Sequence, residues 1–434
     1  MARLYRATFS LLKKITKKAG KSLLSKILII GLHFHPEPIG IGKYTGELAA
    51  YLAAQGHQVR VITTPPNYPH WQVQPGYRAG RYQKETWQGV EIQRCPLWVP
   101  RQPTGLTRLI HLGSFAFSSL PALIAQLRWK PAVVLCIAPS LMNAPFALML
   151  ARFSHAKAWL HIQDFELDAA LKLGLLPAGK RLTGLAAHFE RALLNGFDYL
   201  TTISAGMLAR LHEKGLPQNK TGLFPNWVDT RQIYPLVDET NSLRASLGLS
   251  PEQLVILYAG NMGKKQGLEH LLATARHVQY QPHIQFILCG DGAVRAELED
   301  AAQGLSNVRF LPVQPIEKLN QLLNMADIHV LLQKADAADL VMPSKLSGML
   351  ASGKAVIATA NPDTELERVV SEIGILVPPE DPVALAEAIL RLTRLPAMRS
   401  EFGKKGRAYA VRTWDSALIL SQFEQRLREM VEKD

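Results

Sequence analysis

From residue 26 onward, short apolar runs alternate with segments whose apolar residues recur at helical spacing. The N-terminal half opens with an apolar run at residues 26–30, a helical pattern at 43–55 and a second run at 58–63. A strand, a helix and a strand in this order form a βαβ unit, which predicts a parallel sheet covered on both faces. Further strands are expected at residues 132–137, 158–162 and 199–203, separated by helical segments.

The second half repeats this alternation. Strands are expected at residues 254–259, 285–289, 308–310, 328–332, 355–358 and 374–377. A polar, turn-rich stretch at 225–250 separates the halves and indicates an interdomain linker. The pattern predicts an α/β protein of two Rossmann-like domains facing across a cleft. We assign residues 1–25 to an N-terminal extension, 26–224 and 225–408 to the two domains, and 409–434 to a C-terminal helix packing back on the first domain.

Residues 109–127 are long and nearly uncharged, which raises the question of a transmembrane helix. His111, several serines and a central Pro121 interrupt this apolar segment, and a strand follows it at once. We therefore expect a soluble, membrane-facing pair of helices rather than a membrane span.

Composition and cysteine usage narrow the class of protein. The chain has 434 residues, 47% of them hydrophobic and 20% charged, which is typical of two folded globular domains. The three cysteines, Cys95, Cys136 and Cys289, show no disulfide or metal-ligand spacing. A reducing compartment and the absence of a structural metal follow as expectations.

The net charge of +13 is concentrated at the N-terminus. Residues 1–26 contain eight lysines and arginines and no acid. With Leu4, Leu11, Leu12 and Ile15 this segment would form a basic amphipathic helix. Three interpretations stay open: an anchor on an anionic membrane, an arm for nucleic acid, or a leader without function. Its apolar run is too short for a signal peptide.

A loop at residues 260–267 joins the strand at 254–259 to a predicted helix that begins near Gly267. It contains Asn261, Lys264 and Lys265 among glycines. Glycines let the backbone approach a ligand, and a helix start offers unpaired N–H groups, so the loop fits an anion such as phosphate. A glycine-rich turn with solvated lysines would give the same pattern.

Gly40 and Gly42 resemble a dinucleotide fingerprint, but the first strand ends about ten residues too early for one. The next strand is not followed by a carboxylate for a ribose, and no Walker loop is present. An NAD enzyme is therefore not expected, and a flexible glycine loop at a helix start remains.

Two further segments carry candidate site residues. Ser344 and Lys345 open a predicted helix, where a bound anion would offset the unfavourable position of a lysine in the first turn. His161 and Asp164 lie at the end of a predicted strand, where ligands of parallel sheets gather. A surface lysine and a solvated acidic turn, respectively, are the alternatives.

Long stretches from residue 26 onward resemble the GT-B glycosyltransferases of family 4, a retaining class, and in particular the fucosyltransferases of colanic acid biosynthesis. The matching stretches are GIGKYTGELAAYLAAQGHQVRVIT, RCPLWVPRQP, HLGSFAFSSLPALIAQLRWKP, HIQDFELDA, FPNWVD, YAGNMGKKQGLEH, GDG and MPSKLSGMLASGKAVIATA. They occur in order across almost the whole folded region, and the tail before residue 26 lies outside them.

The resemblance implies a role for most of these candidates. It places Gly40 and Gly42 near the donor diphosphate from one side, and Asn261, Lys264 or Lys265, Ser344 and Lys345 on the other. Gly290 and the loop around Val313 would border the nucleobase. The Glu-x7-Glu pair of the family is missing, because Leu340 and Gly348 stand at its positions. Asp336 or Asp339 is a candidate substitute, and Gln163 replaces a histidine of many relatives.

These expectations combine into one function. We expect a retaining enzyme that moves a sugar, fucose from GDP-fucose by resemblance, to a lipid-linked saccharide at the cytoplasmic face of the plasma membrane. Asp164, His161 and Lys265 are the candidate catalytic residues, and neither a metal nor another cofactor is expected. A sugar-nucleotide epimerase of the same fold and a non-enzymatic binder of membrane or nucleic acid are the alternatives; a nucleic-acid partner is not expected, since aromatic residues are not interleaved with the basic ones.

Overall fold

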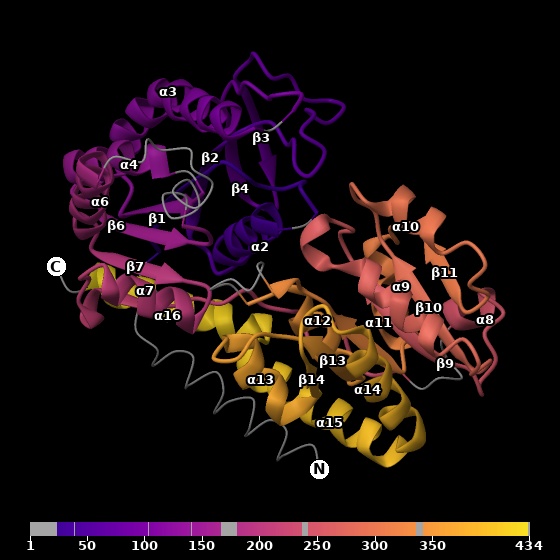
Figure 1. The fold of residues 1–434 in the computed structure, drawn as a ribbon. Helices are drawn as coiled ribbons and strands as arrows, with labels where there is room; N and C mark the ends of the chain where they lie inside the picture. The colour runs from indigo at the N-terminus through magenta and orange to yellow at the C-terminus, as the bar shows by residue number, and fades with distance from the viewer. Residues whose placement is uncertain are drawn as a thin grey trace, which may run out of the picture. The chain divides into compact units, whose positions relative to one another are not determined.

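The computed structural model describes residues 24–38, 40–102, 104–139, 141–165, 180–236, 242–335 and 342–432. The chain divides into two compact units (Figure 1). The N-terminal unit comprises residues 1–161, 165–199 and 424–434, and the C-terminal unit comprises residues 162–164 and 200–423.

The N-terminal sheet has eight strands in the order β3-β4-β2-β1-β5-β6-β7-β8. They are β1 (Lys26–Gly31), β2 (Gln58–Thr63), β3 (Gln83–Trp87), β4 (Val90–Arg94), β5 (Val133–Ala138), β6 (Lys157–Ile162), β7 (Tyr199–Thr202) and β8 (Thr221–Leu223). Strands β4, β2, β1 and β5 run parallel to one another, and the buried apolar runs predicted three of them, β1, β2 and β5.

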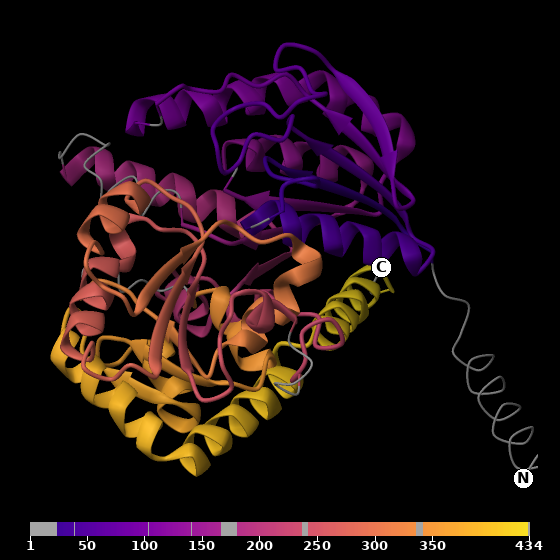
Figure 2. The ribbon, with the colours of Figure 1, turned by 90° about the vertical axis from the view of Figure 1, so that its right-hand side faces the viewer.

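Helices cover this sheet on both faces. They are α2 (Gly40–Ala54), α3 (Gly105–Trp129), α4 (Ala144–Ser154), α6 (Lys180–Asn195) and α7 (Ala205–Glu213), with short 3-10 turns at Leu141–Asn143 and Gln218–Lys220. Helices α3 and α4 pack against each other on one side of the central strands, and α2 lies on the other side (Figures 1 and 2). The predicted βαβ unit is confirmed.

Three sequence expectations for this half are wrong. The hairpin of β3 and β4 was not predicted, and β3 runs antiparallel to β4, so the sheet is not parallel throughout. Residues 109–127 form one continuous helix, α3, instead of a pair, because buried residues on both sides of Pro121 hold the helix against the sheet. Gly40 and Gly42 lie inside the first turn of α2, which begins three residues earlier than expected.

By length and apolar composition alone, α3 is the one helix of the described ranges that is able to cross a membrane. Core helices of water-soluble proteins meet the same criterion, so this property does not show insertion.

The C-terminal sheet has six parallel strands in the order β11-β10-β9-β12-β13-β14. They are β9 (Leu254–Ala259), β10 (Ile284–Cys289), β11 (Val308–Leu311), β12 (Ile328–Leu331), β13 (Ala355–Thr359) and β14 (Ile375–Val377). All six agree with the predicted strands to within one residue at each end. The strand order reverses direction between β9 and β12, as in the doubly wound folds that bind nucleotides.

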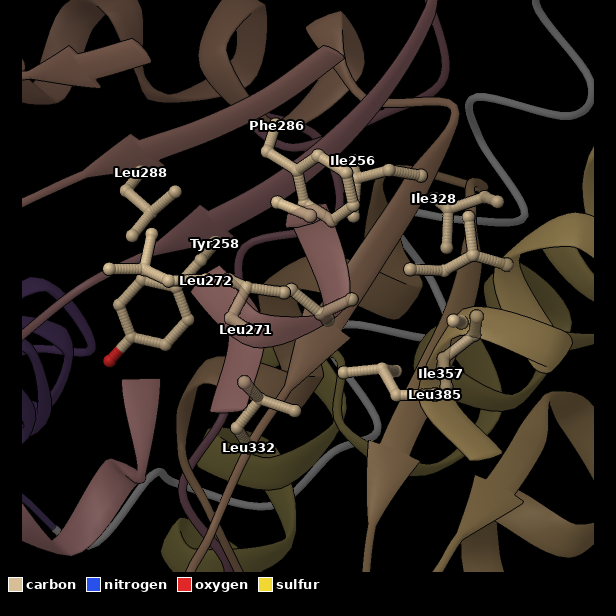
Figure 3. Close-up of a cluster of buried hydrophobic side chains, with 14 of the residues drawn as sticks. Ile256, Tyr258, Leu271, Leu272, Phe286, Leu288, Ile328, Leu332, Ile357 and Leu385 are labelled. Carbon is tan, nitrogen blue, oxygen red and sulfur yellow. The ribbon is translucent and has the colours of Figure 1, made fainter. Parts of the chain in front are cut away.

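The helices of this unit pack on both faces of its sheet. They are α8 (Ser242–Ser246), α9 (Leu268–His277), α10 (Arg295–Ala301), α11 (Leu319–Met325), α12 (Lys345–Ala351), α13 (Glu365–Ile373), α14 (Pro382–Arg394) and α15 (Pro396–Thr413), with 3-10 turns at Lys264–Gln266 and Ile316–Lys318. The last helix, α16 (Ser416–Glu432), begins in this unit and ends in the N-terminal unit. Figure 3 shows part of one core layer, where Leu271 and Leu272 of α9 meet Ile256, Tyr258 and Phe286 of the sheet. Helices α12, α13 and α15 contribute to the opposite layer.

Candidate functional site

The carboxyl ends of β9 and β12 mark the switch point of the C-terminal sheet. Ligands of doubly wound sheets bind outside the carboxyl ends of the strands at such a point. The predicted glycine loop follows β9, and its Lys265 carbonyl accepts a hydrogen bond from the backbone N–H of Lys334, just beyond β12, at 3.0 Å. The loop thus lies at the switch point, as its position after the strand predicted.

Three glycines allow the loops after β9 and β10 to pack backbone against backbone. A Cβ atom on Gly290 would overlap the carbonyl oxygen of Gly260, and one on Gly292 would overlap that of Met262. Backbone hydrogen bonds of 2.8 Å join Gly260 to Cys289 and Met262 to Asp291. Because all three glycines have positive φ, other residues would be strained there. Gly260, Gly290 and Gly292 thus let the two loops approach closely at this edge of the sheet, and we call these three residues the glycine rim.

Lys345, the first residue of α12, reaches across this rim. Its Nζ donates to the Tyr258 hydroxyl at 2.8 Å and lies 4.5 Å from the centre of the Tyr258 ring. The end of its side chain occupies the space that a Cβ on Gly260 would need. Burial lowers the pKa of Lys345 to about 8, since nearby groups do not offset the cost of desolvating its charge. A bound phosphate would offset it.

The other predicted donor-site residues differ from this lysine in their exposure. Lys264 and Lys265 are exposed on a 3-10 turn (Lys264–Gln266), and Gly267, at φ 63°, ends that turn and starts α9. Ser344 is exposed directly before α12, and Val313 is 67% exposed beyond β11. The roles assigned to them, and to exposed Asn261, stay predictions.

The carboxyl edge of the N-terminal sheet is different in character. Glu37, in the loop after β1, is buried and accepts the backbone N–H groups of Asn67 and Tyr68 at 2.9 and 3.0 Å. Gly42 of α2 lies so close that a Cβ there would meet the Glu37 side chain at 2.7 Å. Sequence reasoning did not identify this carboxylate, although the family resemblance placed Gly42 near a diphosphate. The negative charge beside Gly42 weighs against that assignment, which stays a prediction.

Aromatic and imidazole rings surround Glu37. His33 lies 2.8 Å from Glu37 Oε2 through Nδ1, and its ring contacts Tyr68 edge-on at 5.4 Å. The ring of His111 of α3 packs against that of Trp71, with 5.2 Å between their centres. Burial lowers the pKa of His111, and among its neighbours the charge of His33 lowers it while that of Glu37 raises it. Nδ1 of His111 donates to the Trp98 carbonyl at 2.7 Å, so Nε2 of the neutral ring is an acceptor, and no described residue donates to it.

Arg94 fixes the backbone beneath these rings. This arginine of β4 is fully buried and donates to the carbonyls of Thr64 at 2.7 Å and His35, while Glu85 accepts from its Nε at 2.7 Å. It therefore ties the loop after β1 to the loop after β2. Burial, followed by the charge of Arg94, lowers the pKa of His35, whose ring stacks on Trp87 at 3.9 Å.

The predicted catalytic pair lies at the end of β6, with His161 inside the strand and Asp164 just beyond it. His161 is buried within the strand at 2% exposure, and Gln163 is buried just beyond it. Asp164 is exposed. Burial of His161 argues for a packing role, whereas Asp164 keeps access to solvent, and both catalytic assignments stay predictions. Leu340, Asp336 and Asp339, the positions weighed for the missing glutamate pair, lie outside the described residues.

Within the described ranges, no group of three or more His, Cys, Asp or Glu side chains has an arrangement that would hold a metal ion. The three cysteines are buried and form no disulfide with one another. Burial raises the pKa of Cys95 to about 12 and that of Cys289 to about 11, which makes both thiols poor nucleophiles at neutral pH.

Comparison with known proteins agrees with a sugar-transfer site. Residues 40–227 match the family described as Glycosyl transferase 4-like domain, and residues 253–394 match the family described as Glycosyl transferases group 1. WcaI of Escherichia coli (strain K12), whose name assigns it to glycosyl transfer in colanic acid biosynthesis, is 44% identical over 411 residues. The match covers 93% of this chain and 100% of WcaI.

Solved structures share the fold over more than nine-tenths of the chain. Sucrose-phosphate synthase from Thermosynechococcus elongatus has a TM-score of 0.74 at 21% identity, covering 94% of this chain and 100% of that one. HepE of Anabaena in complex with UDP-glucose has a TM-score of 0.65 at 16% identity, covering 93% and 100%. At these identities the likeness concerns the fold: two α/β domains with parallel sheets.

Proposed function

This chain belongs to the GT-B glycosyltransferases, and we propose that it moves a fucosyl group from GDP-fucose to a lipid-linked saccharide with retention of configuration. The product would enter a colanic acid-like extracellular polysaccharide, and the enzyme would act at the cytoplasmic face of the plasma membrane. The full-length match to WcaI supports the pathway, and the resemblance of the sequence motifs supports the fucosyl donor.

The observation that carries sugar transfer from a diphosphate donor is Lys345 beside the glycine rim. A departing diphosphate accumulates negative charge as its bond to the anomeric carbon breaks, so a preorganised cation lowers the barrier. Lys345 is such a cation, held by Tyr258 at the switch point of the sheet. Lys265, exposed on the loop after β9, would add a second charge once a donor is bound.

The step balances without a metal. The bond between the anomeric carbon and the diphosphate oxygen breaks, the acceptor hydroxyl oxygen bonds to that carbon on the same face, and its proton passes to the departing diphosphate. Asp164 would orient the acceptor hydroxyl rather than remove its proton. Metal-free transfer is supported by the available lysine charges, and it stays a prediction.

Binding and turnover with purified nucleotides test the donor. We expect calorimetry to give a dissociation constant for GDP at least about tenfold below that for UDP, and GDP-fucose to release GDP faster when lipid-linked saccharide is added. Tighter binding of UDP than of GDP would overturn the base assignment. Conversion of the donor sugar without any acceptor would instead indicate an epimerase.

A further inference from the structure

The outward side of α3 is apolar along most of its length. The exposed large residues of this helix are Leu106, Ile110, Phe117 and Ile124, which are 68%, 50%, 72% and 63% exposed. Their spacings of four, seven and seven place them within an arc of about 40° at 100° per residue. We call these four residues the α3 stripe. It extends over about 27 Å of helix.

The opposite side of α3 packs on its own unit. Its buried residues include His111, Phe115, Ala122 and Gln126. The Gln126 side chain accepts from Arg60 at 3.2 Å, and His111 donates to the Trp98 carbonyl. Because these polar contacts tie one face of α3 to the sheet, the helix cannot leave it to span a bilayer without breaking them. The α3 stripe can therefore enter one leaflet of a bilayer from its surface while the opposite side of α3 stays packed on the protein.

The charge of the surrounding sequence is entirely positive. No acidic residue occurs between Glu91 and Asp164, while this stretch contains seven arginines and lysines. Exposed cations stand at both ends of α3: Arg101 and Arg108 near its start, and Arg128 and Lys130 near its end. An ordinary solvated helix face would carry charges of both signs in place of large apolar residues.

The charge distribution selects among possible partners. A second copy of this chain docking through the same face would bring the cations at the ends of α3 against those of its partner. An anionic bilayer offers acyl chains to the α3 stripe and phosphate groups to its flanking cations. We propose that α3 is a membrane-docking helix that lies in the interface of an anionic bilayer, with the α3 stripe immersed.

This inference rests on the proposed function in one respect, namely that the acceptor is held in a membrane. It adds a specific surface of the folded protein, separate from the basic segment at residues 1–26. Vesicle binding and nucleotide binding are measured independently, so failure of the docking surface is distinguishable from failure of the donor assignment.

Co-sedimentation of the full chain with phosphatidylcholine vesicles containing 30% phosphatidylglycerol tests the surface. We expect Phe117→Asp/Ile124→Asp to lower the vesicle partition coefficient by about tenfold or more, since two half-immersed apolar side chains are lost. The matched control is Ile316→Asp in the C-terminal unit, an equally exposed isoleucine at 61%, which should bind like the wild type. GDP affinity should be unchanged in both variants.

A fluorescence readout keeps the test independent of any loss of folding. In Phe117→Trp, the added tryptophan should be quenched by vesicles whose acyl chains carry bromine, whereas the tryptophan of Ile316→Trp should not. Equal vesicle binding by Phe117→Asp/Ile124→Asp and the wild type would overturn the proposal and assign the membrane to the basic tail. Absence of quenching at position 117 while the protein sediments with vesicles would overturn it as well.

Discussion

The carboxyl edges of the two sheets carry side chains of opposite charge. At the carboxyl edge of the C-terminal sheet stand glycine backbone and the cation of Lys345. At the carboxyl edge of the N-terminal sheet stand the buried carboxylate of Glu37 and the imidazoles of His33 and His111. Both sheets have a switch point where ligands are expected, so the fold gives two sites and the side chains decide what each one accepts.

The contrast is electrostatic. A diphosphate would be stabilised by the charge of Lys345 and repelled by that of Glu37. A neutral hydroxyl group suits the N-terminal edge, where His111 Nε2 is a buried acceptor without a donor among the described residues. We therefore expect the donor nucleotide at the C-terminal edge and acceptor hydroxyls at the N-terminal edge. Substitutions at each edge should affect only one of these two ligands.

Removal of the cation should have the largest effect. Lys345→Met keeps an unbranched side chain over Gly260 but loses the charge. We expect kcat/KM for GDP-fucose to fall by about a hundredfold or more, as for other charged groups that stabilise a departing anion. Calorimetry with GDP should show a parallel loss of affinity.

The control for this substitution is Lys318→Met, which removes an exposed lysine from the same unit. It should stay within about twofold of the wild type, as exposed substitutions away from a site usually do. A Lys345→Met enzyme with normal GDP affinity would contradict the proposed difference between the two edges, because the lysine would then serve only to pack against Tyr258.

The carboxylate of the other edge should matter less and for the other substrate. Glu37→Gln keeps an oxygen that accepts from the Asn67 and Tyr68 N–H groups, and it removes the charge beside His33. We expect transfer to the acceptor at saturating donor to slow by about thirtyfold, a typical size for a lost acid–base or orienting group. The rate of GDP release with added acceptor measures it.

Nucleotide affinity tells whether the two edges are separate. In Glu37→Gln the dissociation constant for GDP should stay within about twofold of the wild type. Glu91→Gln, which removes an exposed carboxylate paired with Arg60 at 2.9 Å, is the matched control for both measurements. A loss of GDP affinity in Glu37→Gln would mean that the carboxyl edge of the N-terminal sheet also receives the donor.

The smallest expected effect is the pH dependence of GDP binding. Lys345 has a pKa of about 8 in the free enzyme, and a bound diphosphate raises it by favouring the charged form. Below pH 8 the cation is present before binding, and above pH 8 a proton must be taken up. Affinity should therefore fall about tenfold between pH 7 and pH 9.

The same titration in Lys345→Met isolates the lysine. In this variant the affinity should be lower at every pH, and the decline between pH 7 and pH 9 should be absent. Should the variant retain the full decline, another group would be responsible, and the rim of Gly260 and Gly290 would bind the nucleotide without help from the titration of Lys345.

Most of the fold was predictable because buried parallel strands read as apolar runs. Strands β1 and β9 are examples, with almost every side chain buried. Strand β3 was not predicted because it is a polar strand at the edge of the sheet. The available signal was the two-residue turn at Gln88 and Gly89, both of which have positive φ, as is typical of a tight hairpin. Pro121 predicted a break in α3, and packing on both sides of it overrode that local preference.

The candidate site was predictable only where its residues lie in one contiguous motif. The loop at residues 260–267 was identified from glycines, lysines and a following helix. The contact between Tyr258 and Lys345 joins residues 87 positions apart, and Tyr258 reads as an ordinary core residue of β9. The cluster of His33, Glu37 and His111 comes from two segments that looked like a Gly/Pro loop and an apolar helix, so spacing alone gave no signal.

The contacts of Glu424 determine when the N-terminal unit can complete its folding during synthesis. Its carboxylate accepts from Tyr51, 373 residues earlier, at 3.0 Å and from His57, 367 residues earlier, at 3.3 Å. Because Nδ1 of His57 accepts from the Ser25 N–H at 3.2 Å, its Nε2 is the proton donor to Glu424. The first α/β unit therefore completes its polar contacts only after the ribosome has made nearly the whole chain. A nascent chain stalled before residue 424 leaves Tyr51 and His57 without this carboxylate, so the domain that is synthesised first is finished last.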